Sequence, residues 1–254
     1  MSDLKGKVAW VTGAGTGIGR AVAVALAKEG VRVALTGRRE APLRETAELI
    51  GRDDTILLPL DLTKADQVEK AAATLRDGAG GPDILVNNAG ANIPRRYLHQ
   101  LDSATIEMMV GTNLTAPFLT SVAVLPAMRA RGGGLIIQIA SMAGKHVSFL
   151  SGPAYTAAKT GYVALSATIN AEQGIHNIRS TAICPGEVAT PILDLRPVPP
   201  SAEERARMLQ PEDLAEMVLF VARLPDRVCI NELLATPTWN RGLAPQAQTV
   251  SQLP

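Results

Sequence analysis

The 254-residue sequence has few aromatic residues, two cysteines and almost no net charge. Phe, Trp and Tyr make up 3% of it, which argues against the aromatic platforms that stack on nucleic-acid bases. With 25 basic and 24 acidic residues, a net charge of +1 gives no field that would attract nucleic acid or an anionic membrane. Cys184 and Cys229 are too few for a disulfide framework or a zinc site, and we expect no bound metal.

Long apolar runs are also missing. Stretches such as 21–27 are far shorter than the ~18 residues that a membrane span requires, and the first five residues contain no apolar signal region. The sequence therefore predicts a soluble cytoplasmic protein that acts on a small molecule, with neither nucleic acid nor membrane as a partner.

Short apolar runs alternate regularly with helix-like segments. The runs are nearly continuous and rich in Val, Ile and Leu, which is typical of strands buried on both faces of a parallel sheet. This alternation predicts a doubly wound, Rossmann-like α/β fold with helices on both faces. The expected strands are 8–12, 32–36, 55–60, 83–87, 134–140, 180–184 and a seventh near 229–234; the expected helices are 17–29, 42–50, 64–77, 103–111, 113–131, 155–173 and 211–223.

Nothing in the sequence divides the chain, so residues 1–254 are predicted to form one domain. Thr63 is expected to cap the helix at 64–77, and Pro211 to stand in the first turn of the last helix. The stretch 186–210 contains four prolines at 191, 197, 199 and 200 and no clear periodicity. Because long connections of this kind are often lids, it is the candidate lid over the site.

A glycine-rich turn, T-G-A-G-T-G-I-G at 12–19, joins the first strand to the first helix. Glycines let the backbone approach a pyrophosphate that faces the helix N-terminus. The spacing is G-x-x-x-G-x-G, from Gly13, Gly17 and Gly19, and not the common G-x-G-x-x-G. Such a turn can merely close a βα unit, but as the first βα turn of this pattern it predicts dinucleotide binding.

The end of the second strand would face the adenosine ribose of that dinucleotide. A carboxylate there selects NAD, whereas this chain has Gly37, Arg38 and Arg39. A guanidinium can hold a 2′-phosphate, so NADP(H) is expected with Arg38 as the main contact, although both arginines could be solvated loop charges. Asp61 could reach the adenine amino group or be a simple turn residue.

Tyr155 is the only one of the three tyrosines with a lysine four residues on, Lys159. One helical turn separates the two, and a neighbouring cation lowers the pKa of a phenol from ~10, which suits acid/base chemistry on a carbonyl or alcohol. An isolated pair of this kind could be an ordinary contact on a helix surface. Ser141 follows the fifth strand, at the edge where open sheets bind ligands, but it could be a cap, as could Asn113.

Together and in this order, these elements resemble the short-chain dehydrogenase/reductase family. The matching stretch runs from Val8 to about Thr190 and also includes N-N-A-G at 87–90 and P-G at 185–186. The resemblance implies a single-domain, seven-stranded Rossmann fold that assembles as a homotetramer or dimer through the helices at 113–131 and 155–173.

The resemblance also implies roles for individual residues. Tyr155 would exchange the proton, Lys159 would lower its pKa and bind the nicotinamide ribose, Ser141 would hydrogen-bond the substrate oxygen, and Asn113 would hold a water. The residues expected to bind NADP(H) are Gly13, Thr16, Gly17, Ile18, Gly19, Arg38, Arg39, Asp61, Leu62, Asn88, Ala89, Gly90, Tyr155, Lys159, Pro185, Gly186, Val188 and Thr190. Those expected to line the substrate pocket are Ser141, Met142, Phe149, Leu150, Tyr155 and Glu187.

The C-terminal part departs from many relatives, including 3-oxoacyl-carrier-protein reductases, which end in a glycine-rich strand. Here 229–240 reads C-I-N-E-L-L-A-T-P-T-W-N, more similar to hydroxy-acid and amino-acid 3-dehydrogenase relatives. Trp239 could anchor an interface or seal the sheet edge. His146 is expected to be an ordinary surface histidine, and Arg95 and Arg96 could meet an acidic substrate or be solvated.

The sequence thus predicts an NADP(H)-dependent carbonyl reductase or alcohol dehydrogenase. The alternatives are an enzyme similar to 3-oxoacyl-carrier-protein reductases and a catalytically idle dinucleotide sensor.

Overall fold

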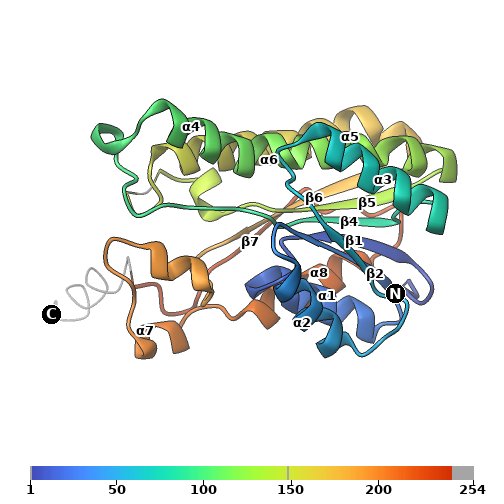
Figure 1. Ribbon diagram of the computed structural model, residues 1–254, viewed down its shortest axis with the longest axis horizontal. Helices are drawn as coiled ribbons and strands as arrows, with labels where there is room; N and C mark the ends of the chain where they lie inside the picture. Colours follow the sequence, from blue (N-terminus) through green and yellow to red (C-terminus); the bar gives the residue numbers. More distant parts are fainter. Residues whose placement is uncertain (1, 148, 242–254) are drawn as a thin grey trace, which may run out of the picture.

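A seven-stranded, all-parallel sheet forms the centre of the structure, a computed structural model that describes residues 2–147 and 149–241 (Figure 1). The strand order is β3-β2-β1-β4-β5-β6-β7, so the chain leaves β1 in one direction and, after β3, continues from β4 in the other. The strands are β1 (Val8–Thr12), β2 (Arg32–Gly37), β3 (Ile56–Pro59), β4 (Ile84–Asn87), β5 (Gly134–Ile139), β6 (Ile178–Pro185) and β7 (Glu232–Ala235). The expected doubly wound α/β fold is confirmed.

Helices cover both faces of the sheet (Figure 1). One layer contains α1 (Gly17–Lys28), α2 (Glu40–Ile50) and α8 (Pro211–Ala222); the opposite layer contains α3 (Ala65–Ala79), α4 (Ser103–Val110), α5 (Ala116–Arg131) and α6 (Pro153–Gln173). The short α7 (Ala202–Ala206) lies in the connection from β6 to α8. A π-helical turn, η2 (Gly111–Thr115), joins α4 to α5.

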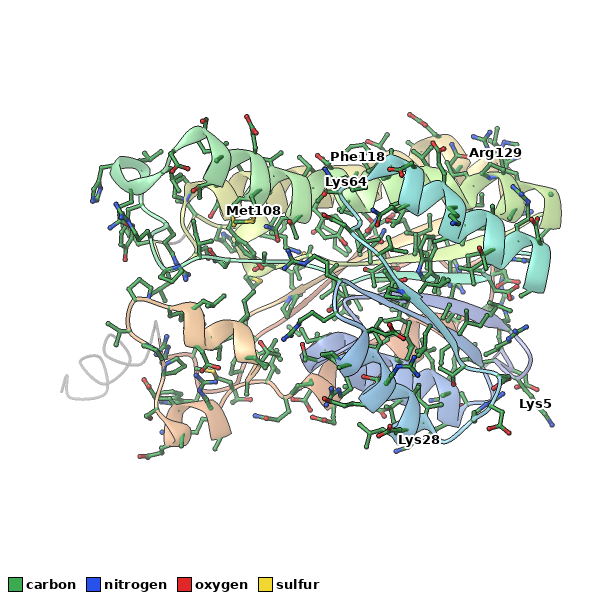
Figure 2. The ribbon with its side chains drawn as sticks, viewed as in Figure 1. Lys5, Lys28, Lys64, Met108, Phe118 and Arg129 are labelled. Carbon is green, nitrogen blue, oxygen red and sulfur yellow. The ribbon has the colours of Figure 1, made fainter. Side chains whose placement is uncertain are left out.

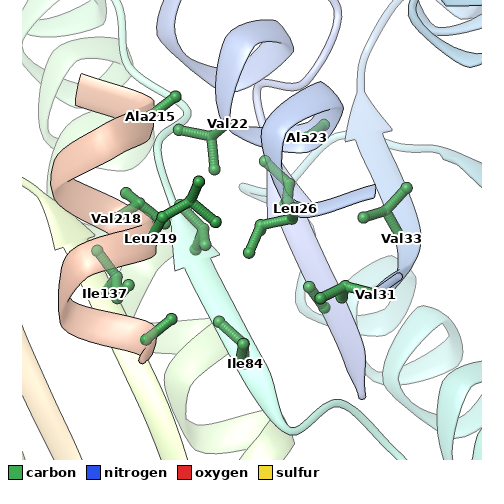
Figure 3. Close-up of a cluster of buried hydrophobic side chains, with 14 of the residues drawn as sticks. Val22, Ala23, Leu26, Val31, Val33, Ile84, Ile137, Ala215, Val218 and Leu219 are labelled. Carbon is green, nitrogen blue, oxygen red and sulfur yellow. The ribbon is translucent and has the colours of Figure 1, made fainter. Parts of the chain in front are cut away.

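Two apolar clusters, one on each side of the sheet, hold these layers together. Between α1 and α8, Val22 and Leu26 face Val218 and Leu219 over the central strands (Figure 3). On the other side, the fully buried Trp10 of β1 packs into the second cluster, and its indole N–H donates to the hydroxyl of Thr36 at 2.8 Å. Continuous burial of β1 and β4 explains why their sequences are apolar up to the polar residue that ends each of them.

The strands and long helices lie where the sequence places them, with shifts of a few residues at their ends. Pro211 begins α8, as expected. The expected cap at Thr63 is wrong: Lys64 is the N-cap of α3, and the Thr63 hydroxyl donates to the carboxylate of Asp61 at 2.8 Å. The stretch 186–210 is less irregular than its sequence indicates, because it contains α7 and a 3-10 turn, η5 (Pro191–Leu195).

The continuous helical stretch Ser103–Arg131 is long and apolar enough to cross a membrane by length and composition alone, although no membrane span was expected. Its 18-residue window has a mean hydropathy of 1.4, and 39% of that window is buried in the structure. Within this stretch Ala116, Val124 and Met128 of α5 pack into the second apolar cluster. Its apolar character is therefore accounted for in part by packing against the sheet.

Candidate active site

A cavity of about 300 Å³ lies beside the carboxyl ends of β1, β4, β5 and β6. This is the edge at which open α/β sheets bind ligands. Its lining combines the glycine-rich turn, the loops that follow these strands, and the first turns of α6. The expected site residues that line it are Gly13, Thr16, Gly17, Ile18, Asn88, Ala89, Gly90, Ser141, Leu150, Tyr155, Lys159, Pro185, Gly186, Glu187, Val188 and Thr190.

Other expected residues lie outside this lining in the described chain. Asn113 and Leu62 are buried, Gly19 packs against Gly13 and Asn88, and Phe149 is 90% exposed on the surface. Met142 is partly buried and packs against the second apolar cluster. Those outside the lining are Gly19, Arg38, Arg39, Asp61, Leu62, Asn113, Met142 and Phe149.

The glycine-rich turn forms a cradle at the N-terminus of α1. Gly13 and Gly17 adopt φ values of +63° and +53°, and a Cβ on Gly19 would lie 2.2 Å from the carbonyl oxygen of Gly13. Thr16, the N-cap, makes no side-chain cap, and the first turn of α1 contains no acidic residue. The first amide groups of α1 therefore remain suited to an anion, so this cradle fits the pyrophosphate of a dinucleotide.

Asn88 ties this cradle to the end of β4. Its backbone N–H donates to the Thr12 hydroxyl at 2.9 Å, and its side-chain amide donates to the carbonyl oxygens of Thr12 and Gly13 at 3.0 and 3.2 Å. The N-N-A-G stretch thus fixes the shape of the turn.

Tyr155, Ser141 and Lys159 converge at the other end of the cavity. Tyr155 stands in the first turn of α6, and Ser141 directly follows β5. Ser141 also accepts from the N–H of Ala143 at 3.1 Å, so the role of a cap is real and coexists with its place beside Tyr155. Lys159 is buried, and its ammonium donates to the carbonyl oxygen of Ile139 at 2.9 Å.

Burial shifts the pKa values of both Lys159 and Tyr155. Burial lowers the pKa of Lys159 to about 7, and it raises the pKa of Tyr155 above its ordinary value of 10. A hydrogen bond with Ser141 and the charges of Arg196 and Arg96 act on the Tyr155 pKa in the opposite direction. This differs from the expectation that Lys159 itself would lower that pKa, because the lysine ammonium is disfavoured by the same burial.

Asn113 lies inside the π-turn η2 and is not a helix cap. Its side-chain oxygen accepts from the N–H of Ala91 at 3.1 Å, and its amide donates to the carbonyl oxygens of Ala91 and Met109 at 3.0 and 2.9 Å. A Cβ on Gly90 would lie 3.1 Å from the Asn113 oxygen and 3.8 Å from Lys159 Nζ. Asn113 therefore reaches the site through the loop that follows β4.

At the end of β2, Arg38 and Arg39 are exposed. Asp61 accepts from the N–H and the hydroxyl of Thr63 at 3.0 and 2.8 Å, which supports the interpretation of Asp61 as a turn residue. These hydrogen bonds are the main cause that lowers the pKa of Asp61, and the charge of Arg38 acts on it in the same direction.

Arg96 and Arg196 also line the cavity. The sequence left Arg96 open between solvent and an acidic substrate: the structure buries it, while Arg95 is exposed. Arg196 was missed, because it lies in a stretch without periodicity. The ring of Trp239 packs 4.0 Å from the guanidinium carbon of Arg207, in the connection to α8. His146 is exposed, as expected.

Comparisons with known proteins agree with this geometry. The family profile described as short chain dehydrogenase matches residues 7–197. The chain is 32% identical over 238 residues to an uncharacterized oxidoreductase of Staphylococcus aureus (strain MRSA252), covering 93% of this chain and 100% of that protein.

Solved structures give the same result. A metagenomic short-chain oxidoreductase in complex with NADP is 34% identical, with a TM-score of 0.80 and coverage of 94% of this chain and 100% of that one. A serine dehydrogenase complexed with NADP⁺ is 31% identical, with a TM-score of 0.82 and coverage of 91% and 94%. An alcohol dehydrogenase from Thermococcus sibiricus complexed with 5-hydroxy-NADP is 28% identical, with a TM-score of 0.81 and coverage of 92% and 98%. The chain therefore belongs to the short-chain dehydrogenase family of nicotinamide-dependent oxidoreductases.

Proposed function

We propose that this protein is an NADP(H)-dependent oxidoreductase that interconverts a carbonyl group and a secondary alcohol, with Tyr155 as the general acid and base. The observation that carries this proposal is the meeting of Tyr155, Ser141 and Lys159 in one cavity with the glycine-rich cradle. A bound nicotinamide would supply or accept the hydride.

In this proposal the chain manages the proton and the orientation of the substrate. The phenol of Tyr155 gives a proton to the substrate oxygen in reduction and removes it in oxidation. Ser141 holds the same oxygen by a hydrogen bond, and Lys159 binds the nicotinamide ribose. Asn113 positions the loop at Ala91 through two hydrogen bonds to that residue, while a third, to Met109, connects it to α4. In addition, Asn113 holds a water of the proton path.

NADP(H) is preferred to NAD(H) in this proposal because β2 ends at Gly37, where no carboxylate would repel a 2′-phosphate. The exposed guanidinium of Arg38 follows directly and would bind that phosphate, with Arg39 in support. The NADP complexes of two similar structures support this preference. The presence of the phenol and lysine argues against an idle dinucleotide sensor, which needs neither.

The Tyr155→Phe variant tests the proposal, because it keeps the ring and removes only the hydroxyl group that gives and takes the proton. With NADPH and a panel of ketones and oxo acids, we expect turnover to fall by about 10²- to 10⁴-fold, the usual contribution of a general acid or base. NADPH binding, followed by its fluorescence, should change little. Tyr97→Phe is the matched control, since Tyr97 does not line the cavity in the described chain. Near-normal turnover by Tyr155→Phe would rule out the acid/base role.

A further inference from the structure

Arg96 is a buried cation beside the cavity, with 3% of its surface exposed. Its Nε donates to the carbonyl oxygen of Ile93 at 2.7 Å, and its two terminal nitrogens donate to the carbonyl oxygens of Leu150 at 2.8 Å and Leu195 at 2.7 Å. A guanidinium has five N–H donors, so one on each terminal nitrogen has no acceptor among the described residues. The group is firmly positioned but only partly satisfied.

No carboxylate in the described part of the chain offsets the charge of Arg96. Within residues 2–147 and 149–241, none lies within 4.0 Å of it. The other buried arginine, Arg179, has Asp226 at 3.8 Å. Burying a charge without a counter-charge is costly, and an arginine does not lose its proton to avoid that cost. A bound anion would therefore stabilise the buried charge of Arg96.

The charge around Arg96 is positive on balance. Arg196 also lines the cavity and pairs with Glu187, and Glu187 is shared with Arg241 at 2.9 Å. Glu204 pairs with Arg241 at 3.2 Å, so this set of three arginines and two glutamates carries one excess positive charge even with Lys159 left aside. A single negative charge on a ligand would neutralise it.

An anion bound by Arg96 would lie apart from the pyrophosphate cradle. Arg96 and Arg196 both act electrostatically on the Tyr155 phenol, which places them at the reactive end of the cavity. Arg96 also donates a hydrogen bond to Leu150, five residues before Tyr155, whereas the cradle is formed by Thr16, the N-cap of α1, and Gly17 in its first turn. An anion held by Arg96 would belong to the molecule that Tyr155 acts on.

We propose that Arg96 binds a carboxylate of the substrate, and that the enzyme therefore acts on small hydroxy and oxo carboxylic acids. This inference rests on the proposed function, because it assumes that Tyr155 marks the reacting oxygen. The two unused N–H groups of Arg96 supply charge-assisted hydrogen bonds to the carboxylate. Arg196, already paired with Glu187, adds to the field without being the direct partner.

The test compares acids with their neutral counterparts. The substrates are a series of 2-, 3- and 4-hydroxy carboxylic acids and the methyl ester of each, assayed for kcat/KM with NADP⁺. We expect the best acid to exceed its ester by about 10- to 100-fold, which corresponds to roughly 1.4–2.8 kcal/mol at ~1.4 kcal/mol per tenfold. Arg96→Gln should remove that preference, so that the ratio of kcat/KM for the acid to kcat/KM for its ester falls to about one; the loss of the Arg96 charge also acts on the Tyr155 pKa, but it does so for acid and ester alike and cancels in this ratio.

Arg95→Gln is the matched control, because it removes the same charge from the neighbouring, exposed position. This variant should leave the ratio of the kcat/KM values for acid and ester unchanged. An ester used as well as its acid by the unmodified protein would overturn the inference. An equal loss of kcat/KM on acid and ester in a folded Arg96→Gln variant would also overturn it. Arg96 would then serve only to hold together the loops at Ile93, Leu150 and Leu195.

A second measurement needs no variant. Calorimetry of the unmodified protein with saturating NADP⁺ compares the binding of propionate and butyrate with that of propionamide and butyramide. Carboxylates that bind at least tenfold more tightly support the inference, and equal binding overturns it even if Arg96→Gln fails to fold. Tighter carboxylate binding without turnover of any hydroxy acid would refute the proposed function and leave the anion site standing. Turnover of neutral alcohols but of no hydroxy acid would support the proposed function and overturn the inference about Arg96.

Discussion

The ammonium of Lys159 lies 5.7 Å from the centroid of the Tyr155 ring, one turn further along α6. The same ammonium lies 4.5 Å from the centroid of Tyr162 and donates to the carbonyl of Ile139. These neighbours are neutral, so their attraction for the ammonium charge is weaker than the hydration that the charge loses on burial. The pKa of about 7 follows from that balance, and it makes the charge on Lys159 sensitive to pH near neutrality.

This depressed pKa predicts a pH-dependent stability. The pKa of Lys159 is about 7 when folded and 10.5 in its ordinary state, so between these values the unfolded chain binds one proton more than the folded chain. The free energy of unfolding should therefore rise with pH in that window, by at most about 1.4 kcal/mol per unit. Below pH 7 the full cost of burying the charge is present, and above about 10.5 it disappears.

Lys159→Met removes this cost, so the variant should gain stability over the unmodified protein most at low pH. By the same linkage, the gain should be about 2 kcal/mol smaller at pH 9 than at pH 7, measured by denaturant unfolding. Packing effects of methionine cancel in that difference. Lys64→Met, at an exposed position, is the control for the loss of one lysine. An equal gain at both pH values would contradict the shifted pKa.

Arg38→Ala should reduce the preference for NADP(H) over NAD(H). A charge-assisted hydrogen bond to the 2′-phosphate contributes about 1.5–3 kcal/mol, or roughly 10- to 150-fold in the ratio of kcat/KM values for the two cofactors. Salt should narrow the preference of the unmodified protein, because exposed charges are screened. Arg44→Ala removes an exposed arginine of α2 and serves as the control. An unchanged ratio in Arg38→Ala would assign Arg38 to the solvated surface.

Most of the fold could be predicted because the central strands are buried on both faces and are therefore apolar at most positions. The ends of elements were harder to predict, because local hydrogen bonds compete there. Thr63 was a plausible helix cap, but the carboxylate of Asp61 takes both of its donors. Such a competition depends on geometry that residue types alone do not specify.

The site likewise contains residues that could be predicted from the sequence and residues that could not. Tyr155 and Lys159 could be found from their spacing, because one helical turn brings them together wherever the helix lies. Arg96 could not be distinguished from Arg95, since the burial of Arg96 depends on Leu150 and Leu195, which are far away in the sequence. The place of Asn113 in a π-turn had no sequence signal beyond the family resemblance.

The assembly expected through α5 and α6 predicts a change of oligomeric state on mutation. Phe118 and Val122, one turn apart on α5, are 44% and 61% exposed, and Phe118 lies along the outer layer of helices (Figure 2). Exposed apolar side chains that adjoin on a helix are typical of interfaces. Phe118→Glu combined with Val122→Glu should lower the molar mass measured by light scattering to a smaller species. Leu49→Glu, on α2 in the opposite layer, should not, and an unchanged mass in the double variant would place the interface elsewhere.

The stretch 186–210 is predicted to become more ordered when cofactor and substrate bind. Val188, Leu193 and Met208 anchor this stretch by burial, but other contacts are polar: Arg241 pairs with Glu187 and Glu204, and Arg207 packs against Trp239. Polar contacts at a surface can rearrange at low cost, and a closing segment excludes water from the reacting atoms.

Hydrogen exchange of the backbone amides should therefore slow across 191–206 when NADPH and an active substrate are added together. The amides of β5 and β6 are the internal reference, since they are held in the sheet in either state. Trp239→Ala should speed exchange around Arg207 without ligand, because it removes the aromatic face on which that guanidinium packs. Equal exchange of 191–206 with and without ligands would mean that this stretch is a fixed wall of the cavity and not a lid.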